Sequence, residues 1–149
     1  MDPVEMARDV VDTNFYMTLG TADAAGRPWV SPVYFAAAGY RDFYWASVPE
    51  AVHSRNLAVR AELSIVIFNS QVPVNQGRAV YLEAVGAEVA AGDLDAGIAI
   101  YNRPAAARGA SIFGRTDLQA PARHRLYRAT AVRQYLLDGS DQRIPVRLG

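Results

Sequence analysis

The side chains able to carry chemistry are few in this chain. His53 and His124 are its two histidines among 149 residues, cysteine is absent, and all fifteen basic residues are arginine. Without cysteine there is no thiol nucleophile, disulfide or thiolate metal site. Without lysine there is no Schiff-base amine and no P-loop lysine. A bound phosphate therefore depends on arginine, histidine, hydroxyl groups or backbone N–H groups.

The sequence lacks the short motifs that mark several enzyme classes. It contains no HExxH, no GxSxG and no GxGxxG. These absences argue against a zinc site, a serine hydrolase and a dinucleotide bound in the Rossmann manner. We therefore expect no metal, and we assign no catalytic side chain.

The overall charge indicates which partners to expect. Fifteen basic and fifteen acidic residues give a formal net charge of zero, so no net field attracts nucleic acid or an anionic membrane. The amino terminus lacks a charged segment followed by an apolar one, and no window has 18 apolar residues in a row. We expect a cytoplasmic protein with a small-molecule substrate.

The first third of the chain changes from helical to strand periodicity. Apolar residues at helical spacing predict a helix within residues 1–14, which begins near Asp2. Three β-rich runs follow at 15–23, 29–38 and 43–47, separated by glycine-containing turns. This pattern predicts an antiparallel meander.

A helix is predicted next, over residues 48–60. Ser47 and Glu50 have the spacing of a capping box, and Pro49 falls in the first turn, where its missing N–H costs nothing. The run at 63–68 (LSIVIF) is apolar on both faces and predicts a strand covered on both sides.

The second half of the chain gives a similar mixture. We expect a strand at 78–89, a helix at 93–107, a loop at 109–122, a strand at 126–137 and a tail at 138–149.

Consecutive strands with few helices between them favour a closed antiparallel barrel over a doubly wound parallel sheet. The expected fold class is therefore mainly β. No repeat or linker divides the chain, so residues 1–149 are expected to form one domain. The two-faced apolar strands bury more surface than one small barrel can hide, which favours a homodimer.

The segment from Gly26 to Leu57 carries the most specific pattern. GRPWVSPVYF, then FYWAS, then HSRNLAVRAELSIVIF, then a strand that follows Gly77 and reads RAVYLEA, together resemble the pyridoxamine 5'-phosphate oxidase-like superfamily of FMN-binding split barrels and their deazaflavin-using relatives. The resemblance covers residues 10–137 as an order of elements. It implies a six-stranded antiparallel Greek-key split barrel, assembled as a homodimer with a flavin in each of two grooves at the subunit interface.

The same resemblance implies a set of cofactor-binding positions. Residues 31–36 would run along the flavin ring and ribityl chain, and His53 matches a basic phosphate ligand. Ser47 is equally well explained as a helix cap, His53 as a surface residue, and Asn56 as a local hydrogen-bonding group. The full set is Ser31, Pro32, Val33, Tyr34, Ala46, Ser47, His53, Arg55, Asn56 and Arg78.

Several positions depart from the pattern of the authentic oxidases. Ser31, Ala36 and Val52 stand where the family has basic residues, and Ala79 stands where it has glutamine. The carboxyl-terminal motif of arginines and a tryptophan is also missing. The resemblance therefore implies a substrate other than pyridoxamine phosphate.

Three functions remain open from the sequence. The first is an FMN-binding oxidoreductase in which the flavin moves hydride or electrons. The second keeps the fold but uses the deazaflavin F-420, whose acidic tail needs a basic groove. The third is a non-catalytic flavin or haem binding protein. Four arginines near the last strand are either a solvated strand face or such a groove: Arg123, Arg125, Arg128 and Arg133.

Overall fold

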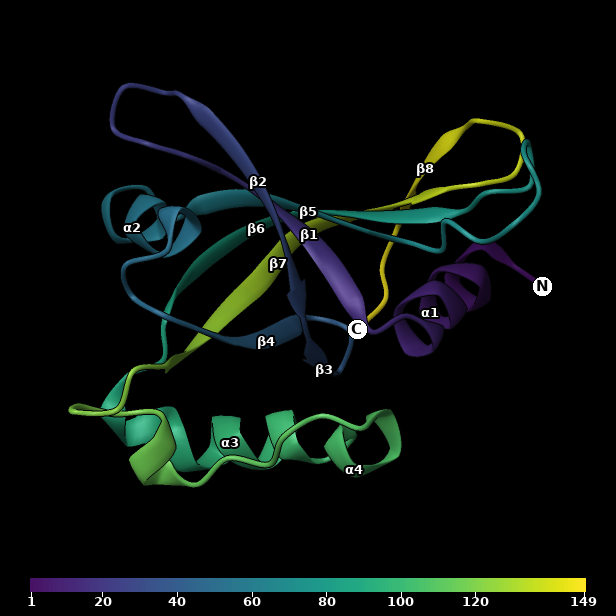
Figure 1. The fold of residues 1–149 in the computed structure, drawn as a ribbon. Helices are drawn as coiled ribbons and strands as arrows, with labels where there is room; N and C mark the ends of the chain where they lie inside the picture. Colours follow the sequence, from purple (N-terminus) through teal and green to yellow (C-terminus); the bar gives the residue numbers. More distant parts are fainter.

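A single antiparallel sheet of eight strands organises the computed structural model, which describes residues 1–149. The strand order is β2-β1-β5-β6-β7-β4-β3, and β8 pairs with β7 (Figure 1). The mainly-β split barrel is confirmed. It has six long strands and two additional short ones, β3 and β8. The bounds are β1 Tyr16–Ala22, β2 Pro28–Tyr34, β3 Ala36–Ala38, β4 Asp42–Ser47, β5 Glu62–Phe68, β6 Ala79–Glu88, β7 Arg125–Leu137 and β8 Arg143–Val146.

The run expected as one strand over 29–38 is in fact two strands, which lie at opposite edges of the sheet. β2 pairs with β1 and β3 pairs with β4, so the chain crosses from one edge to the other at Phe35. The Phe35 side chain is buried, and its N–H donates to the carbonyl oxygen of Phe15 at 3.1 Å. A chain can join both edges in one residue only if the sheet curls, and β2 accordingly contacts β4.

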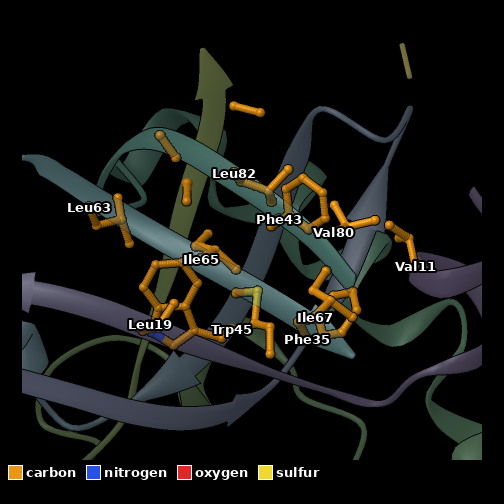
Figure 2. Close-up of a cluster of buried hydrophobic side chains, with 14 of the residues drawn as sticks. Val11, Leu19, Phe35, Phe43, Trp45, Leu63, Ile65, Ile67, Val80 and Leu82 are labelled. Atoms are coloured by element: carbon orange, nitrogen blue, oxygen red, sulfur yellow. The ribbon is translucent and has the colours of Figure 1, made fainter. Parts of the chain in front are cut away.

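The concave face of the curled sheet holds the main core. On β5, Leu63, Ile65 and Ile67 are buried, while the residues between them face outward. Figure 2 shows these side chains meeting Leu19 from β1 and Leu82 from β6. Strict alternation is what a strand with one buried face requires. The outward side of LSIVIF is only partly apolar, since it carries Ser64, half-buried Val66 and exposed Phe68.

The predicted amino-terminal helix, α1 (Pro3–Thr13), closes one end of this core. Asp2 caps it by accepting a bond from the Glu5 N–H at 2.9 Å, and the Glu5 carboxylate accepts from the Asp2 N–H at 3.1 Å. This reciprocal pair satisfies two donors that the helix leaves free. Its buried face is Ala7, Val10 and Val11.

The helix expected over 93–107 is broken into two, α3 (Leu94–Asn102) and α4 (Ala105–Arg108). Pro104 breaks it, because proline has no N–H to donate to the Ile100 carbonyl oxygen four residues earlier and its ring crowds that carbonyl. Short 3-10 turns flank the pair at Ala91–Asp93 and Arg115–Asp117.

The α3–α4 layer lies below the sheet in Figure 1 and forms a second, smaller core against β3, β4 and β7. Gly97 permits the close approach, since a Cβ there would lie 2.8 Å from Leu126 Cδ2 and 3.1 Å from Tyr44 Cε1. None of the helices has the length and apolar character needed to cross a membrane.

We expected residues 138–149 to be only a tail, but they contain strand β8. β4 pairs with β7 only as far as Thr130, which leaves the rest of that β7 edge free, and β8 occupies it. The Gln134 side chain accepts the Leu148 N–H at 3.0 Å, and Arg8 donates to the Leu148 carbonyl oxygen at 2.7 Å. These bonds hold the tail by its backbone groups, and the Leu148 side chain is also buried in the main core.

The concave core gives a direct test of stability. We expect Ile67→Ala to lower the free energy of unfolding by about 2–5 kcal/mol, because the side chain is fully buried and the methyl groups removed leave a cavity. Val74→Ala, at a residue 90% exposed in the loop between β5 and β6, should change it by less than about 0.5 kcal/mol. Urea unfolding of both variants measures the difference, and equal losses would contradict this assignment of the core.

Candidate functional site

The junction between β4 and α2 (Val52–Val59) differs from the predicted capping box. Ser47 remains in β4, and the helix begins four residues later than expected, after Ala51, which makes no side-chain cap. The residues between form a turn closed by the Ala51 N–H and the Val48 carbonyl oxygen at 3.2 Å. Pro49 is the second residue of this turn, a position that proline favours. Glu50 is exposed in the turn and caps nothing.

Ser47 instead pairs with His53, and this pair is the centre of the candidate site. The Ser47 Oγ and His53 Nε2 atoms lie 2.8 Å apart. His53 is 7% exposed, so it is not a surface histidine, and burial lowers its pKa below the ordinary 6.5. The imidazole is therefore neutral at neutral pH, with one nitrogen that donates and one that accepts.

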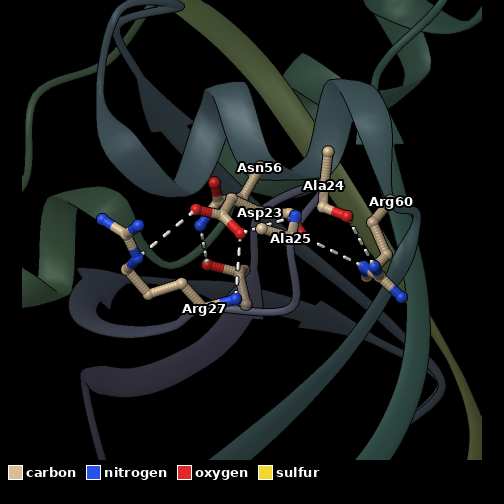
Figure 3. A network of polar contacts seen from close by, with 7 residues as sticks. Asp23, Ala24, Ala25, Arg27, Asn56 and Arg60 are labelled. Atoms are coloured by element: carbon tan, nitrogen blue, oxygen red, sulfur yellow. Dashed lines mark hydrogen bonds and ion pairs between the residues drawn. The ribbon is translucent and has the colours of Figure 1, made fainter.

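Asn56 and Arg60 fasten α2 to the β1–β2 hairpin (Figure 3). The buried Asn56 amide donates to the Thr21 hydroxyl at 3.1 Å, and Arg60 donates to the carbonyl oxygens of Asp23 and Ala24 at 3.3 and 3.5 Å. The Asn56 bond is therefore not the local one that its sequence position left open, because its partner in β1 is 35 residues away. These bonds fix the position of α2 and, with it, that of His53.

The two predicted arginines lie in different places. Arg55 is exposed on α2, and its side chain makes no hydrogen bond or ion pair. Arg78 lines a hollow of about 300 Å³ beside α1 with Asp9 and Thr13. Figure 1 shows α1 and α2 at opposite ends of the sheet, so Arg78 does not join Ser47 and His53 within one chain.

The predicted ring-binding segment, residues 31–36, is divided between the two sheet edges: residues 31–34 belong to β2 and Ala36 begins β3. Ser31 is half-buried and Val33 buried on the concave side, while Pro32 and Tyr34 point the other way. Because β2 pairs only with β1, its other backbone edge has no strand partner. This edge contacts both β4 and α2, so it lies beside the end of β4 that carries Ala46 and Ser47.

Tyr34 joins this edge to the α3–α4 layer. Its ring meets the Tyr101 ring edge-on, with centroids 5.6 Å apart, and its buried hydroxyl has no hydrogen-bond partner. Burial raises the pKa of Tyr101 to about 12, so that phenol stays protonated. Arg108 of α4 donates to the Phe35 carbonyl oxygen at 3.0 Å and stacks over the Phe15 ring. The layer thus fixes the corner where β2 becomes β3.

Four residues around the Ser47–His53 pair were missed as a group by the sequence analysis. The Tyr127 ring stacks on Trp45 with centroids 5.7 Å apart, and the buried Ser54 hydroxyl lies beside it. Burial raises the pKa of Tyr127, and the nearby Ser54 lowers it. Arg125 lies opposite Ser47 in the β4–β7 pairing. No local signal identifies this group, because strand register brings it together.

The arginines near the last strand do not form one basic groove. Tyr44 lies directly opposite Arg128 in the β4–β7 pairing, and its hydroxyl raises the pKa of the Arg128 guanidinium. Arg133 forms a 3.8 Å ion pair with Glu83, and Arg125 turns toward backbone carbonyl oxygens. Each side chain therefore serves a different part of the sheet.

The residues brought together are suited to an anion. Hydroxyl, imidazole and guanidinium groups are donors that phosphate prefers. Ser47 and His53 supply the first two in direct contact, and Arg55 is an exposed guanidinium two residues farther along α2. No group of three or more histidine, cysteine, aspartate or glutamate side chains is placed to hold a metal ion. The structure thus has one polar, partly cationic end at the open side of the barrel.

Comparisons with known proteins give a consistent fold. The family model described as "Pyridoxamine 5'-phosphate oxidase" matches residues 4–135. A search of curated proteins found no match. Among solved structures, the chain is similar to a haem-binding protein from Mycobacterium smegmatis, with a TM-score of 0.77, 22% identity, and coverage of 98% of this chain and 58% of that one.

Two further structures show the range of ligands within this fold. HutZ, the haem storage protein of Vibrio cholerae, has a TM-score of 0.73 and 23% identity, and the match covers 93% of this chain and 95% of HutZ. A FAD-binding protein from Mesorhizobium loti has a TM-score of 0.67 and 16% identity, with 89% and 91% coverage. At these identities the likeness shows a shared fold.

The buried imidazole predicts a pH effect on stability. Because the pKa of His53 is below 6.5 in the folded chain and about 6.5 in the unfolded chain, the unfolded chain binds more protons between these values. The free energy of unfolding should therefore fall as the pH falls through about 6.5 toward the folded pKa. His53→Gln, which keeps a polar group near Ser47 but does not titrate, should flatten this fall. Urea unfolding between about pH 7.5 and about pH 5.5 measures it, and parallel curves would contradict the prediction.

Proposed function

The chain belongs to the pyridoxamine 5'-phosphate oxidase family, and from this premise we propose that it binds FMN as a homodimer and acts as a flavin-dependent oxidoreductase. Its substrate is a small molecule other than pyridoxamine phosphate, because Ser31, Ala36, Val52 and Ala79 replace family side chains that are basic or an amide.

The observation that carries the proposal is the Ser47–His53 pair at the open edge of the barrel. Arg55 follows two residues after His53 on α2, where it is exposed and its guanidinium makes no bond, and β2, whose outer backbone edge is unpaired, contacts both β4 and α2. Each charge-assisted hydrogen bond to a phosphate contributes about 1.5–3 kcal/mol when desolvated. The donor set fits the phosphate of FMN, and the flat backbone edge at 31–34 suits a planar ring.

The residues of this chain have binding and orienting roles in the proposed reaction. Bound FMN supplies the hydride or electron transfer. Ser47, His53 and Arg55 hold the phosphate, residues 31–34 lie along the ring, and Ala46 lies next to the phosphate end. Asn56 positions α2 through Thr21 and does not touch the ligand.

A second copy of the chain is the proposed cover for the outward face of the sheet. That face carries a hollow of about 670 Å³ lined by Val30, Val85 and Val132, all exposed. Contiguous exposed apolar surface of this kind marks an interaction site. Dimerisation is common in the family, and a second copy is also the source from which Arg78 would reach the site.

Haem binding is the second candidate. It is supported by the haem proteins from M. smegmatis and V. cholerae that share this fold. If histidine is the ligand of haem iron, one of its imidazole nitrogens must be free to bind the metal. His53 Nε2 is engaged by Ser47, whereas the His124 side chain makes no hydrogen bond and stacks near Phe113, with centroids 6.5 Å apart. The two candidates therefore depend on different histidines.

The flavin proposal is tested by titrating the purified protein with FMN and following fluorescence quenching. We expect wild-type affinity in the micromolar range or better, about −8 kcal/mol. The double variant His53→Ala, Arg55→Ala should bind at least about tenfold more weakly, a loss of about 1.4 kcal/mol, because two phosphate donors are removed. Arg27→Ala, at an exposed arginine on the β1–β2 turn, is the matched control and should bind as the wild type does.

Several results would change the assignment. A wild-type protein that does not quench FMN fluorescence contradicts flavin binding. A Soret band that appears on adding haem, and that His124→Ala abolishes while His53→Ala keeps it, would establish the haem candidate instead. Tighter binding of the deazaflavin F-420 in competition with FMN would establish that cofactor. Reduction by NAD(P)H without saturable turnover would leave a flavin carrier and not an enzyme.

The dimer is tested separately by sedimentation equilibrium. Val30→Glu places a charge on the outward face at a residue 69% exposed, so it should leave the fold intact and shift the protein toward monomer. Val74→Glu, on the loop between β5 and β6, should leave the dimer unchanged. A wild-type protein that sediments as a monomer at all concentrations would refute the proposed assembly.

A further inference from the structure

Arg125 is placed at the same end of the barrel as the Ser47–His53 pair. It is the first residue of β7 and the direct partner of Ser47 in the antiparallel β4–β7 pairing. Directly opposed residues of an antiparallel pair extend from the same face, with Cβ atoms about 4.5–5.5 Å apart. The next partners on that face, Trp45 and Tyr127, are stacked, which shows that this register is maintained in the packing. Arg125 therefore extends from the face that carries Ser47.

The guanidinium of Arg125 is half-buried without a carboxylate partner. Its Nη1 donates to the carbonyl oxygens of Ala122 and His124, at 2.5 and 2.7 Å, and its other two nitrogens make no hydrogen bond. Partly buried charges are costly when no opposite charge accompanies them. The ion pairs of the protein are elsewhere: Arg27–Asp23, Arg115–Asp95 and Arg133–Glu83.

The proposed anion site lacks one positive charge without Arg125. A phosphate monoester carries nearly two negative charges at neutral pH. His53 is neutral because it is buried, which leaves Arg55 as the single cation on α2. Glu88 of β6 and, more weakly, Glu50 of the turn before α2 act on Tyr127 with their negative charges, so both add negative charge nearby. Electrostatic balance therefore calls for a second cation on this face.

We propose that Arg125 is the second cation of this site and binds the anionic end of the cofactor. The guanidinium leaves the carbonyl oxygens of Ala122 and His124 and pairs with the phosphate of FMN. The inference rests on the proposed function for the identity of the ligand, but its chemistry is that of any planar cofactor with a phosphate or carboxylate end. Arg125 has a binding role here and takes no part in electron transfer.

The test compares two flavins that differ only in the phosphate. Arg125→Gln should weaken FMN binding at least about tenfold and leave riboflavin binding unchanged, because only FMN presents an anion to the lost charge. Arg123→Gln, an exposed arginine two residues earlier, is the matched control and should bind both flavins as the wild type does. Circular dichroism and the melting temperature show whether each variant is folded.

A variant of opposite sign strengthens the test. Glu50→Gln removes the negative charge on the turn, so it should tighten FMN binding by about two- to threefold and leave riboflavin binding unchanged. Unchanged FMN binding by Glu50→Gln contradicts an anion site on this face, and with it the inference. A purely structural role for Arg125 predicts that Arg125→Gln weakens both flavins equally, and that result also overturns the inference.

The remaining outcomes separate the inference from the proposed function. If Arg125→Gln binds FMN normally while the double variant His53→Ala, Arg55→Ala does not, the proposal of FMN binding is supported and the proposed role of Arg125 is wrong. If the wild type binds no FMN, pyrophosphate is the probe, and its effect on the melting temperature is measured. Stabilisation that Arg125→Gln abolishes keeps Arg125 as an anion-binding residue although the flavin proposal fails. Absence of stabilisation overturns the inference as well.

Discussion

The passage of the chain from one sheet edge to the other at Phe35 is the constraint on which the rest of the structure depends. It forces the sheet to curl, and the curl lets Leu19, Ile65 and Ile67 meet the aromatic side chains in one core. Burial of that core supplies the driving force, and the Phe35–Phe15 backbone bond keeps the corner closed. The curl also brings the unpaired edge of β2 beside the end of β4.

The open side of the barrel gains its chemical character from α2. Asn56 and Arg60 attach the helix to the β1–β2 hairpin, and this attachment buries His53 against Ser47. Burial makes the imidazole a neutral hydrogen-bonding group, so positive charge has to come from guanidinium groups. The absence of lysine from the chain gives arginine this task at every position. Neutral hydrogen-bonding groups with a few arginines can bind and orient a cofactor that performs the chemistry itself.

Much of the fold was accessible from the sequence because its signals are local. The amino-terminal helix, the position of strand β5 and the long last strand all follow from local runs of apolar side chains, although β5 was expected to be covered on both faces and is buried on one. The predictions were wrong where a tertiary contact overrode a local sequence preference. Ser47 and Glu50 have capping-box spacing, but neither caps the helix. Ser47 is hydrogen-bonded to His53, and Glu50 lies in the turn that contains Pro49. The tail became strand β8 because β7 offered it a free edge.

For the candidate site, the sequence by itself determined which side chains were available and which chemistries were excluded. It placed Ser47, His53 and Arg55 within nine residues, so their proximity follows from chain connectivity. Only the tertiary structure decided that Arg78 lies near α1, that Asn56 serves the hairpin, and that Arg125 lies opposite Ser47. The physical reason is strand register: pairing residues 47 and 125 depends on how the whole sheet curls, and no local pattern encodes it.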